Sequence, residues 1–237
     1  MKTSDVYNLF FEPGEVTEIR AFGLSKSNKA WEGWAGGTGI VYGYFDNAED
    51  FGKAADGLEA AKAPGVYFTL NPVIPDLLAR SANRLQAAKA KSASTSDKGI
   101  VCVRWLPIDL DPVRPAGISS TDAELKAAEG VANKIYKWMD TLGWAKPVVA
   151  VSGNGVHLVY RLPDIADLDA GSSNVRNALR VLEEKFGTKK VNVDGTVFNP
   201  ARIWKLYGTT ARKGDHTESR PHRVSFVKDM ERLMNNG

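Results

Sequence analysis

The sequence contains a single cysteine, Cys102, among its 237 residues. One cysteine excludes an internal disulfide and any zinc site built on several cysteines, so we expect no zinc, and it fits a reducing compartment. No segment approaches the roughly 18 consecutive apolar residues that cross a bilayer, and the start, "MKTSDVYNLFFEPGE", has no apolar signal core. We therefore expect a cytoplasmic protein with no membrane association.

Strong charge of one sign is also missing. The formal net charge is +3, which is too weak to indicate a nucleic-acid binder by itself, although basic residues concentrate after Arg202. The composition is that of an ordinary globular protein, and the length allows one large domain or two small ones with a sizeable core. Without a repeat or a convincing boundary, we expect one α+β domain.

Short apolar runs bounded by turn residues predict strands. They cover residues 15–22, 39–45, 65–70 and 100–110, a hairpin over 146–162, and a short strand from residue 191. The serine-rich segment 91–99 is the best candidate for a linker loop.

Helical spacing of apolar residues predicts the helices. One covers 46–63 with Asp46 or Asn47 as its cap, a second covers 75–90, and the segment 228–237 also looks helical. Thr121 and Glu124 form a possible capping box for a third. The expected apolar faces of the third and fourth helices are Ala128, Val131, Ile135, Met139 and Leu142, and Val175, Ala178, Leu179, Leu182 and Phe186.

Two acidic residues end the long strand in "VRWLPIDLDPVRPAG". Asp109 and Asp111 are two apart, so on a strand they share one face with Cα atoms about 7 Å apart. At about 5 Å their carboxylates would repel by roughly 3 kcal/mol at an effective dielectric of about 20, which favours a cation between them. Mg²⁺ or Mn²⁺ suits such oxygen ligands. The alternative is a frayed strand end in water.

The turn "SGNGVH", Ser152 to His157, is the second feature. Two glycines let the backbone turn tightly, Ser152 and Asn154 add short polar side chains, and backbone N–H groups in such a turn can bind phosphate oxygens beside a histidine. An ordinary hairpin turn followed by a half-buried histidine explains the same residues.

The third feature is "VNVDGTVFNPARIWKLYGTTARKGD". Asp194 could add a carboxylate to the same site, although Asp-Gly is also a common turn pair. Arg202 and Lys205 would share one face of a short helix after Pro200. With the later basic residues they could bind a triphosphate or form a solvated face; these residues are Arg212, Lys213, Arg220, His222 and Arg223.

Acids for a metal, a glycine turn for phosphates and a basic cluster together describe a nucleotidyl-transfer site. In this order, and over about residues 66–226, the three motifs resemble those of the prim-pol branch of the archaeo-eukaryotic primase superfamily, known from phage, plasmid and CRISPR-associated replication proteins. The resemblance implies a smaller N-terminal α/β part, about residues 1–95, and a catalytic part over 96–237 with a sheet like that of an RNA-recognition motif. The active site would lie in the cleft between them.

The resemblance also assigns residues to roles. Asp109, Asp111 and Asp194 match the acids that hold two divalent ions, and His157 matches the histidine that contacts the triphosphate. The expected nucleotide-binding residues are Ser152, Asn154, His157, Arg202, Lys205, Arg212 and Lys213. This chain departs from many relatives in having Gly155 for a serine, and Lys205 and Tyr207 for arginine and proline.

The hypothesis is a template-dependent DNA primase-polymerase acting on single-stranded template, primer and nucleoside triphosphates. The template would follow a basic groove in which Trp or Tyr side chains stack on bases, and the candidates for this groove are Trp31, Trp34, Arg80 and Arg114. The family and the abrupt end suggest a piece of a longer protein with a helicase or accessory domain.

Two other classes remain open. A non-catalytic DNA-binding replication-initiator module would keep sequence-specific binding after loss of both aspartates. A metal-dependent nucleotide-sugar glycosyltransferase also uses Asp-x-Asp, but it gives no reason for Asp194 followed by Arg202 and Lys205.

Overall fold

The computed structural model describes residues 1–24, 39–88 and 94–228. The chain forms two compact units of α+β architecture with antiparallel sheets. Unit 1 comprises Met1–Val101 and Ala201–Thr210, and unit 2 comprises Cys102–Pro200 and Ala211–Gly237. The chain first crosses from unit 1 to unit 2 after Val101, and the return of residues 201–210 to unit 1 was not anticipated.

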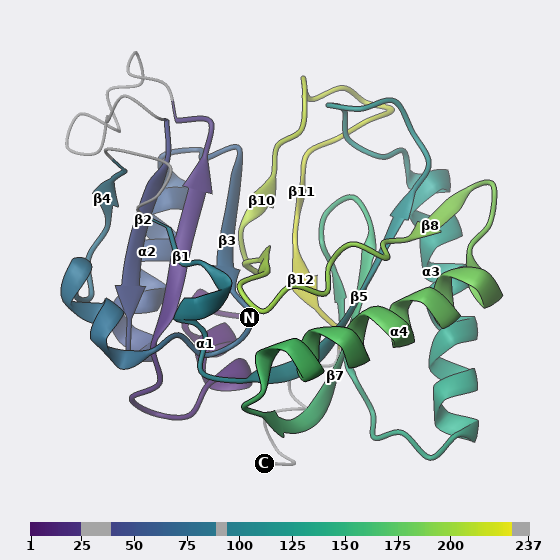
Figure 1. Cartoon of the computed structure of the whole chain (residues 1–237). Helices are drawn as coiled ribbons and strands as arrows, with labels where there is room; N and C mark the ends of the chain where they lie inside the picture. The colour runs from purple at the N-terminus through teal and green to yellow at the C-terminus, as the bar shows by residue number, and fades with distance from the viewer. Residues whose placement is uncertain (25–38, 89–93, 229–237) are drawn as a thin grey trace. The chain divides into compact units, whose positions relative to one another are not determined.

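Unit 1 is built on a five-stranded sheet in the order β4-β2-β1-β3-β9 (Figure 1). Its strands are β1 (Thr17–Phe22), β2 (Val41–Phe45), β3 (Gly65–Thr69), β4 (Gln86–Ala87) and β9 (Ile203–Lys205). The central strands β1, β2 and β3 confirm the expected apolar runs. Strand β9 comes from the far end of the chain and pairs antiparallel with β3.

Two helices pack against each other in unit 1, and α2 also packs on the sheet. The helices are α1 (Thr3–Phe10) and α2 (Ala48–Ala60). Asn47 caps α2, because its side chain accepts a hydrogen bond from the Asp50 backbone N–H at 2.9 Å. Aromatic side chains fill the core between helix and sheet, with Phe51 and Phe68 edge to face at 6.2 Å.

Unit 2 contains a second five-stranded sheet, in the order β12-β6-β7-β5-β8. Its strands are β5 (Val103–Pro112), β6 (Val148–Val151), β7 (Val156–Ile165), β8 (Val191–Val193) and β12 (Phe226–Val227). The expected hairpin is confirmed as β6 and β7, with Val151 opposite Val156. Strand β10 (Thr210–Ala211), at the boundary of the two units, forms a small sheet with β11 (Arg223–Val224).

Helices α3 (Asp122–Thr141) and α4 (Leu168–Phe186) pack against β5 and β7. The capping box is confirmed: Glu124 N–H donates to Thr121 Oγ1 at 3.2 Å, and Thr121 N–H donates to Glu124 Oε2 at 2.8 Å. The expected apolar face of α3 is buried except for Leu142, which is 55% exposed. Leu142 lies just beyond the helix, where the helical period no longer sets its direction.

The helix expected over 75–90 is wrong beyond its first turn. Residues Pro75–Arg80 form a 3₁₀-helix, and β4 follows. The backbone of the intervening turn bonds to β2 instead of continuing a helix: Tyr44 N–H donates to Ser81 O, and Asn83 N–H to Tyr44 O. Asn83 adopts a left-handed φ of 50°, which ends a helix.

The short helix expected after Pro200 is also wrong, because this segment is strand β9. Leu70 N–H donates to Arg202 O, and Thr69 lies opposite Ile203. Residues three apart on extended chain point to opposite faces, so Arg202 and Lys205 do not share one.

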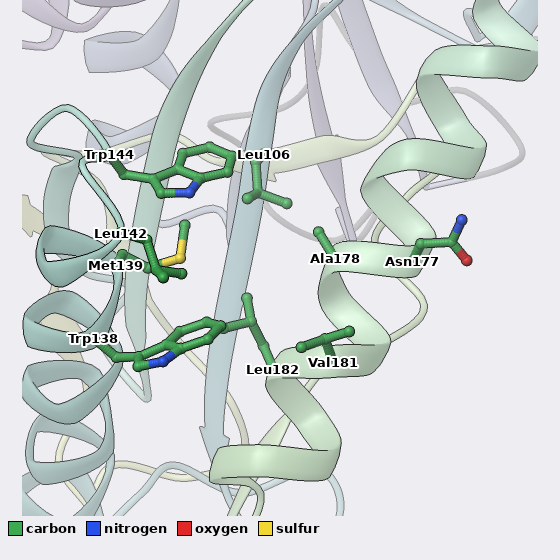
Figure 2. Close-up of a pocket in the computed structure, with 9 residues that line it drawn as sticks. All are labelled: Leu106, Trp138, Met139, Leu142, Trp144, Asn177, Ala178, Val181 and Leu182. Atoms are coloured by element: carbon green, nitrogen blue, oxygen red, sulfur yellow. The ribbon is translucent and has the colours of Figure 1, made fainter.

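A pocket of about 300 Å³ lies beside α3 and α4 (Figure 2). No charged side chain lines it, so it is not the expected phosphate site. Its lining residues are Leu106, Trp138, Met139, Leu142, Trp144, Asn177, Ala178, Val181 and Leu182.

Three expectations fall outside the described residues: Trp31 and Trp34 as template contacts, the first part of the 91–99 linker loop, and the helix over 228–237 apart from its first residue. Within the described ranges, none of the helices is long and apolar enough to cross a membrane.

Candidate active site

Strand β5 brings Asp109 and Asp111 onto one face of the unit 2 sheet. Ile108 and Leu110, which alternate with them, are fully buried on the other face. Leu106 shares that apolar side and lines the pocket beside α3 and α4. The two aspartates therefore lie on the face turned away from these helices, where both are only partly buried.

Both neighbours of β5 add polar side chains to this face. His157 on β7 lies directly opposite Asp109, with Nε2 3.4 Å from Asp109 Oδ1. Asn192 on β8 lies opposite Asp111. Asp194 N–H donates to Asp109 O at 2.9 Å, which extends the same register by one pair. Residues directly opposite on antiparallel strands share a face, so His157 and Asn192 lie on the same face as Asp109 and Asp111.

The Asp109 carboxylate lacks the partners that a buried acid usually has. Its Oδ1 is buried and accepts no hydrogen bond of ordinary geometry from the described residues. Burial raises the pKa of Asp109, but the charges of His157, Lys213 and Arg114 outweigh this effect and hold the pKa below its usual value. Asp109 is therefore held as an anion, and among the described residues its buried Oδ1 has the long 3.4 Å contact with His157 but no hydrogen bond of ordinary geometry, a form suited to a cation.

Asp111 behaves in the opposite way. Burial, together with the negative charge of Asp109, raises the pKa of Asp111 above its usual value. Arg114 Nη1 lies 3.5 Å from Asp111 Oδ1 and also donates to Pro112 O at 3.0 Å. The negative charge of Asp109 and the positive charge of Arg114 therefore act on Asp111 in opposite directions.

Gly155 packs tightly against β5, next to Asp111. A Cβ at this position would lie 2.5 Å from Leu110 O and 2.9 Å from Asp111 Oδ1, so the close approach of the hairpin to β5 requires glycine. A serine at this position would not fit this backbone.

The turn residues Ser152 and Asn154 have structural hydrogen bonds. Ser152 Oγ accepts from Gly155 N–H at 3.0 Å, which closes the turn. Asn154 is 4% exposed, and its Oδ1 accepts from Ser120 N–H at 2.8 Å. Their contact with a phosphate stays a prediction.

Asp194 lies next to Asp109 along the sheet, but its carboxylate turns toward its own loop. Asp194 Oδ1 accepts from Thr196 N–H at 2.8 Å and from Thr196 Oγ1 at 2.7 Å. Among the described residues, no three His, Cys, Asp or Glu side chains converge closely enough to hold a metal ion. Asp194 as a third ligand therefore stays a prediction.

The expected basic residues divide between the two units. Lys213 belongs to unit 2 and is exposed. Its positive charge acts to lower the pKa of both aspartates, although at Asp111 burial and the charge of Asp109 outweigh this effect. Arg212, beside it, is partly buried. Arg202 and Lys205 belong to unit 1, where Lys205 is 6% exposed and donates to Thr209 Oγ1 at 2.7 Å. A phosphate contact by Arg202 or Lys205 stays a prediction.

Sequence reasoning missed two neighbours of the site. Asn192 comes beside Asp111 only through the pairing of β5 with β8, which no local pattern indicates. Arg114 was considered only for a template, although its position three residues after Asp111 could have indicated the ion pair.

No family model matches the chain, and no curated protein matches it. One solved structure that it resembles is the polymerase domain from Mycobacterium tuberculosis Ligase D in complex with DNA. The identity is 16%, the match covers 99% of this chain and 85% of that chain, and the TM-score is 0.49. A likeness at this level carries no argument, so the function is argued from the site.

Proposed function

We propose that the chain is a template-dependent DNA primase-polymerase that joins nucleotides at the Asp109 and Asp111 face of unit 2. The observation that carries this proposal is the pair of carboxylates on one sheet face, with His157 Nε2 3.4 Å from Asp109. Hard oxygen ligands beside a phosphate-binding histidine suit metal-dependent phosphoryl transfer.

The residues present fit a divalent cation. Asp109 Oδ1 is buried and has a single long contact, with His157, among the interactions given for the described residues, and Asp111 lies on the same face with its side chain 42% exposed. Asp109 and Asp111 would bind Mg²⁺ or Mn²⁺, with Asp194 as a candidate third ligand. Such ions supply activation of a primer 3′-hydroxyl and charge stabilisation of the departing pyrophosphate.

The protein's own side chains would bind and orient the nucleotide. His157 is 4% exposed and held by the sheet, so it can donate to a phosphate oxygen without first becoming ordered. Lys213 adds an exposed positive charge whose field reaches both carboxylates. A triphosphate between them would have its negative charge stabilised from two sides.

The test is nucleotide incorporation on a single-stranded DNA template, with and without a primer, in Mg²⁺ or Mn²⁺. The wild type is compared with a double variant, Asp109→Asn plus Asp111→Asn. A matched control carries Asp76→Asn plus Asp140→Asn, which removes two exposed aspartates. We expect the site variant to lose at least about a hundredfold in rate, equivalent to about 2.7 kcal/mol, while the control retains the rate.

Two results would overturn the proposal separately. A wild type that yields no template-directed product contradicts the function. Undiminished synthesis by the site variant contradicts the assignment of Asp109 and Asp111. DNA binding that survives in the site variant, with no synthesis by the wild type, favours a replication-initiator module instead.

A further inference from the structure

The exposed Lys213 lies on the loop 212–222, which joins β10 to β11. This loop rests on the segment before α3: Ser119 Oγ donates to Lys213 O at 3.2 Å. A Cβ at Gly214 would lie 2.7 Å from Gly117 O, so the two backbones are in close contact. The position of Lys213 therefore depends on how firmly the loop is held there.

Arg220 fixes the far side of the loop. Its Nη1 and Nη2 donate to Glu124 Oε2 and Oε1 at 2.9 and 3.0 Å, which is a bidentate pair. Nη1 also donates to Ser119 O at 2.7 Å. Both side chains of the pair are about one quarter exposed, and Glu124 is already fixed by the capping box of α3.

Arg223 makes a second attachment at the same helix end. Its Nη1 donates to Ser120 O at 2.7 Å, and its Nη2 donates to Asp122 Oδ1 at 2.6 Å. Ser120 N–H in turn donates to Asn154 Oδ1 in the glycine turn. The start of α3 thus connects the loop of Lys213 with the turn that precedes His157.

We propose that Arg220 and Arg223 are positioning residues, which hold the loop 212–222 on the start of α3 and so fix the position of Lys213 for phosphate binding. The inference rests on the proposed function. It also replaces both sequence-based alternatives for these arginines, a triphosphate contact or a solvated face, because their guanidinium groups bind protein acceptors in this structure.

The attachment itself is tested by hydrogen–deuterium exchange of the loop amides. Arg220→Ala should raise exchange within 212–222 by about tenfold, since the bidentate pair is lost. Glu124→Gln should act in the same direction, because glutamine retains the capping acceptor but not the charge. Arg180→Ala is the matched control, since its ion pair with Glu184 on α4 is about two-thirds exposed.

Unchanged exchange in both site variants would overturn the proposal. Thermal unfolding of each variant shows whether it folds. If Arg220→Ala does not fold, Glu124→Gln still tests the proposal.

The consequence for Lys213 is tested by calorimetric binding of inorganic tripolyphosphate to four proteins: wild type, Arg220→Ala, Lys213→Ala and the double variant. Each single change should weaken binding by about five- to tenfold. The double variant should bind no more weakly than Lys213→Ala alone, because Arg220 acts through Lys213.

If the two single changes weaken tripolyphosphate binding independently, so that their effects multiply in the double variant, Arg220 does not act through Lys213 and the positioning role is wrong. A wild type that binds no tripolyphosphate contradicts the proposed function, and this result is distinguishable because the exchange experiment needs no ligand.

Discussion

Two carboxylates on sheet strands, Glu18 in unit 1 and Asp109 in unit 2, have opposite surroundings. Glu18 is completely buried, accepts two bonds from Arg20 at 2.8 and 2.7 Å, and accepts a third from Thr95 N–H at 2.9 Å. Asp109 is 22% exposed and has one buried oxygen with no hydrogen bond from the described residues. Glu18 accepts three short hydrogen bonds from the protein, whereas Asp109 has a long 3.4 Å contact with His157 and so keeps binding capacity that a ligand can use.

The largest expected effect on stability comes from changing Glu18. Glu18→Gln should lower the free energy of unfolding by about 3–5 kcal/mol, because it leaves the Arg20 charge buried without its anion. Chemical denaturation measures this loss. Glu49→Gln is the control, since its ion pair with Lys53 is exposed and should contribute less than about 1 kcal/mol. Equal losses in the two variants would remove the distinction between Glu18 and an ordinary surface acid.

An effect of intermediate size on stability is expected at Gly155, where the hairpin backbone packs against β5 next to Asp111. Gly155→Ala should cost about 1–3 kcal/mol and weaken Mn²⁺ binding, because its Cβ would crowd Leu110 O and Asp111 Oδ1. Gly130→Ala is the control, since a Cβ there meets nothing within 4 Å. Chemical denaturation and metal titration of both variants provide the comparison. If Gly155→Ala has the same stability and Mn²⁺ affinity as the control variant, β7 can move away from β5 and the glycine is not required.

The smallest expected effect is that of Asp111 on stability. Its raised pKa means that the folded state favours the protonated form of this group, so the contribution of Asp111 to stability should increase as pH falls from neutral through that pKa. Asp111→Asn should lack this gain and should differ from the wild type by less than about 1 kcal/mol, since the side chain is 42% exposed.

Urea unfolding at neutral and mildly acidic pH measures the difference. Asp140→Asn, which removes an exposed acid, serves as the control. If the wild type instead loses stability relative to Asp111→Asn as the pH falls over this range, the pKa of Asp111 is lowered in the folded state and the prediction is wrong.

Local signals in the sequence predicted much of the fold. The Asn47 cap, the Thr121 and Glu124 box and the β6–β7 hairpin depend on residues a few positions apart, so short patterns contain them. The pairing of β9 with β3 joins segments more than 130 residues apart in sequence. No local pattern encodes such a contact, and so the segment after Pro200 was misinterpreted as a helix.

The candidate site divides in the same way. That Asp109 and Asp111 share a face follows from the period of a strand, and the sequence predicted it. That His157 lies opposite Asp109 depends on the register of β7 against β5, and that Arg220 binds Glu124 depends on a loop 96 residues further along the chain. The sequence shows that Lys213, Arg220 and Arg223 are all basic, but it could not show that the two arginines bind protein groups.

The most direct test of the central claim is calorimetric titration of Mn²⁺ into the wild type and into the Asp109→Asn plus Asp111→Asn variant. The unsatisfied carboxylate predicts that the wild type binds Mn²⁺ and that the variant binds at least about tenfold more weakly, a difference of about 1.4 kcal/mol. Equal affinity in the two proteins would contradict the assignment of these aspartates as the metal site.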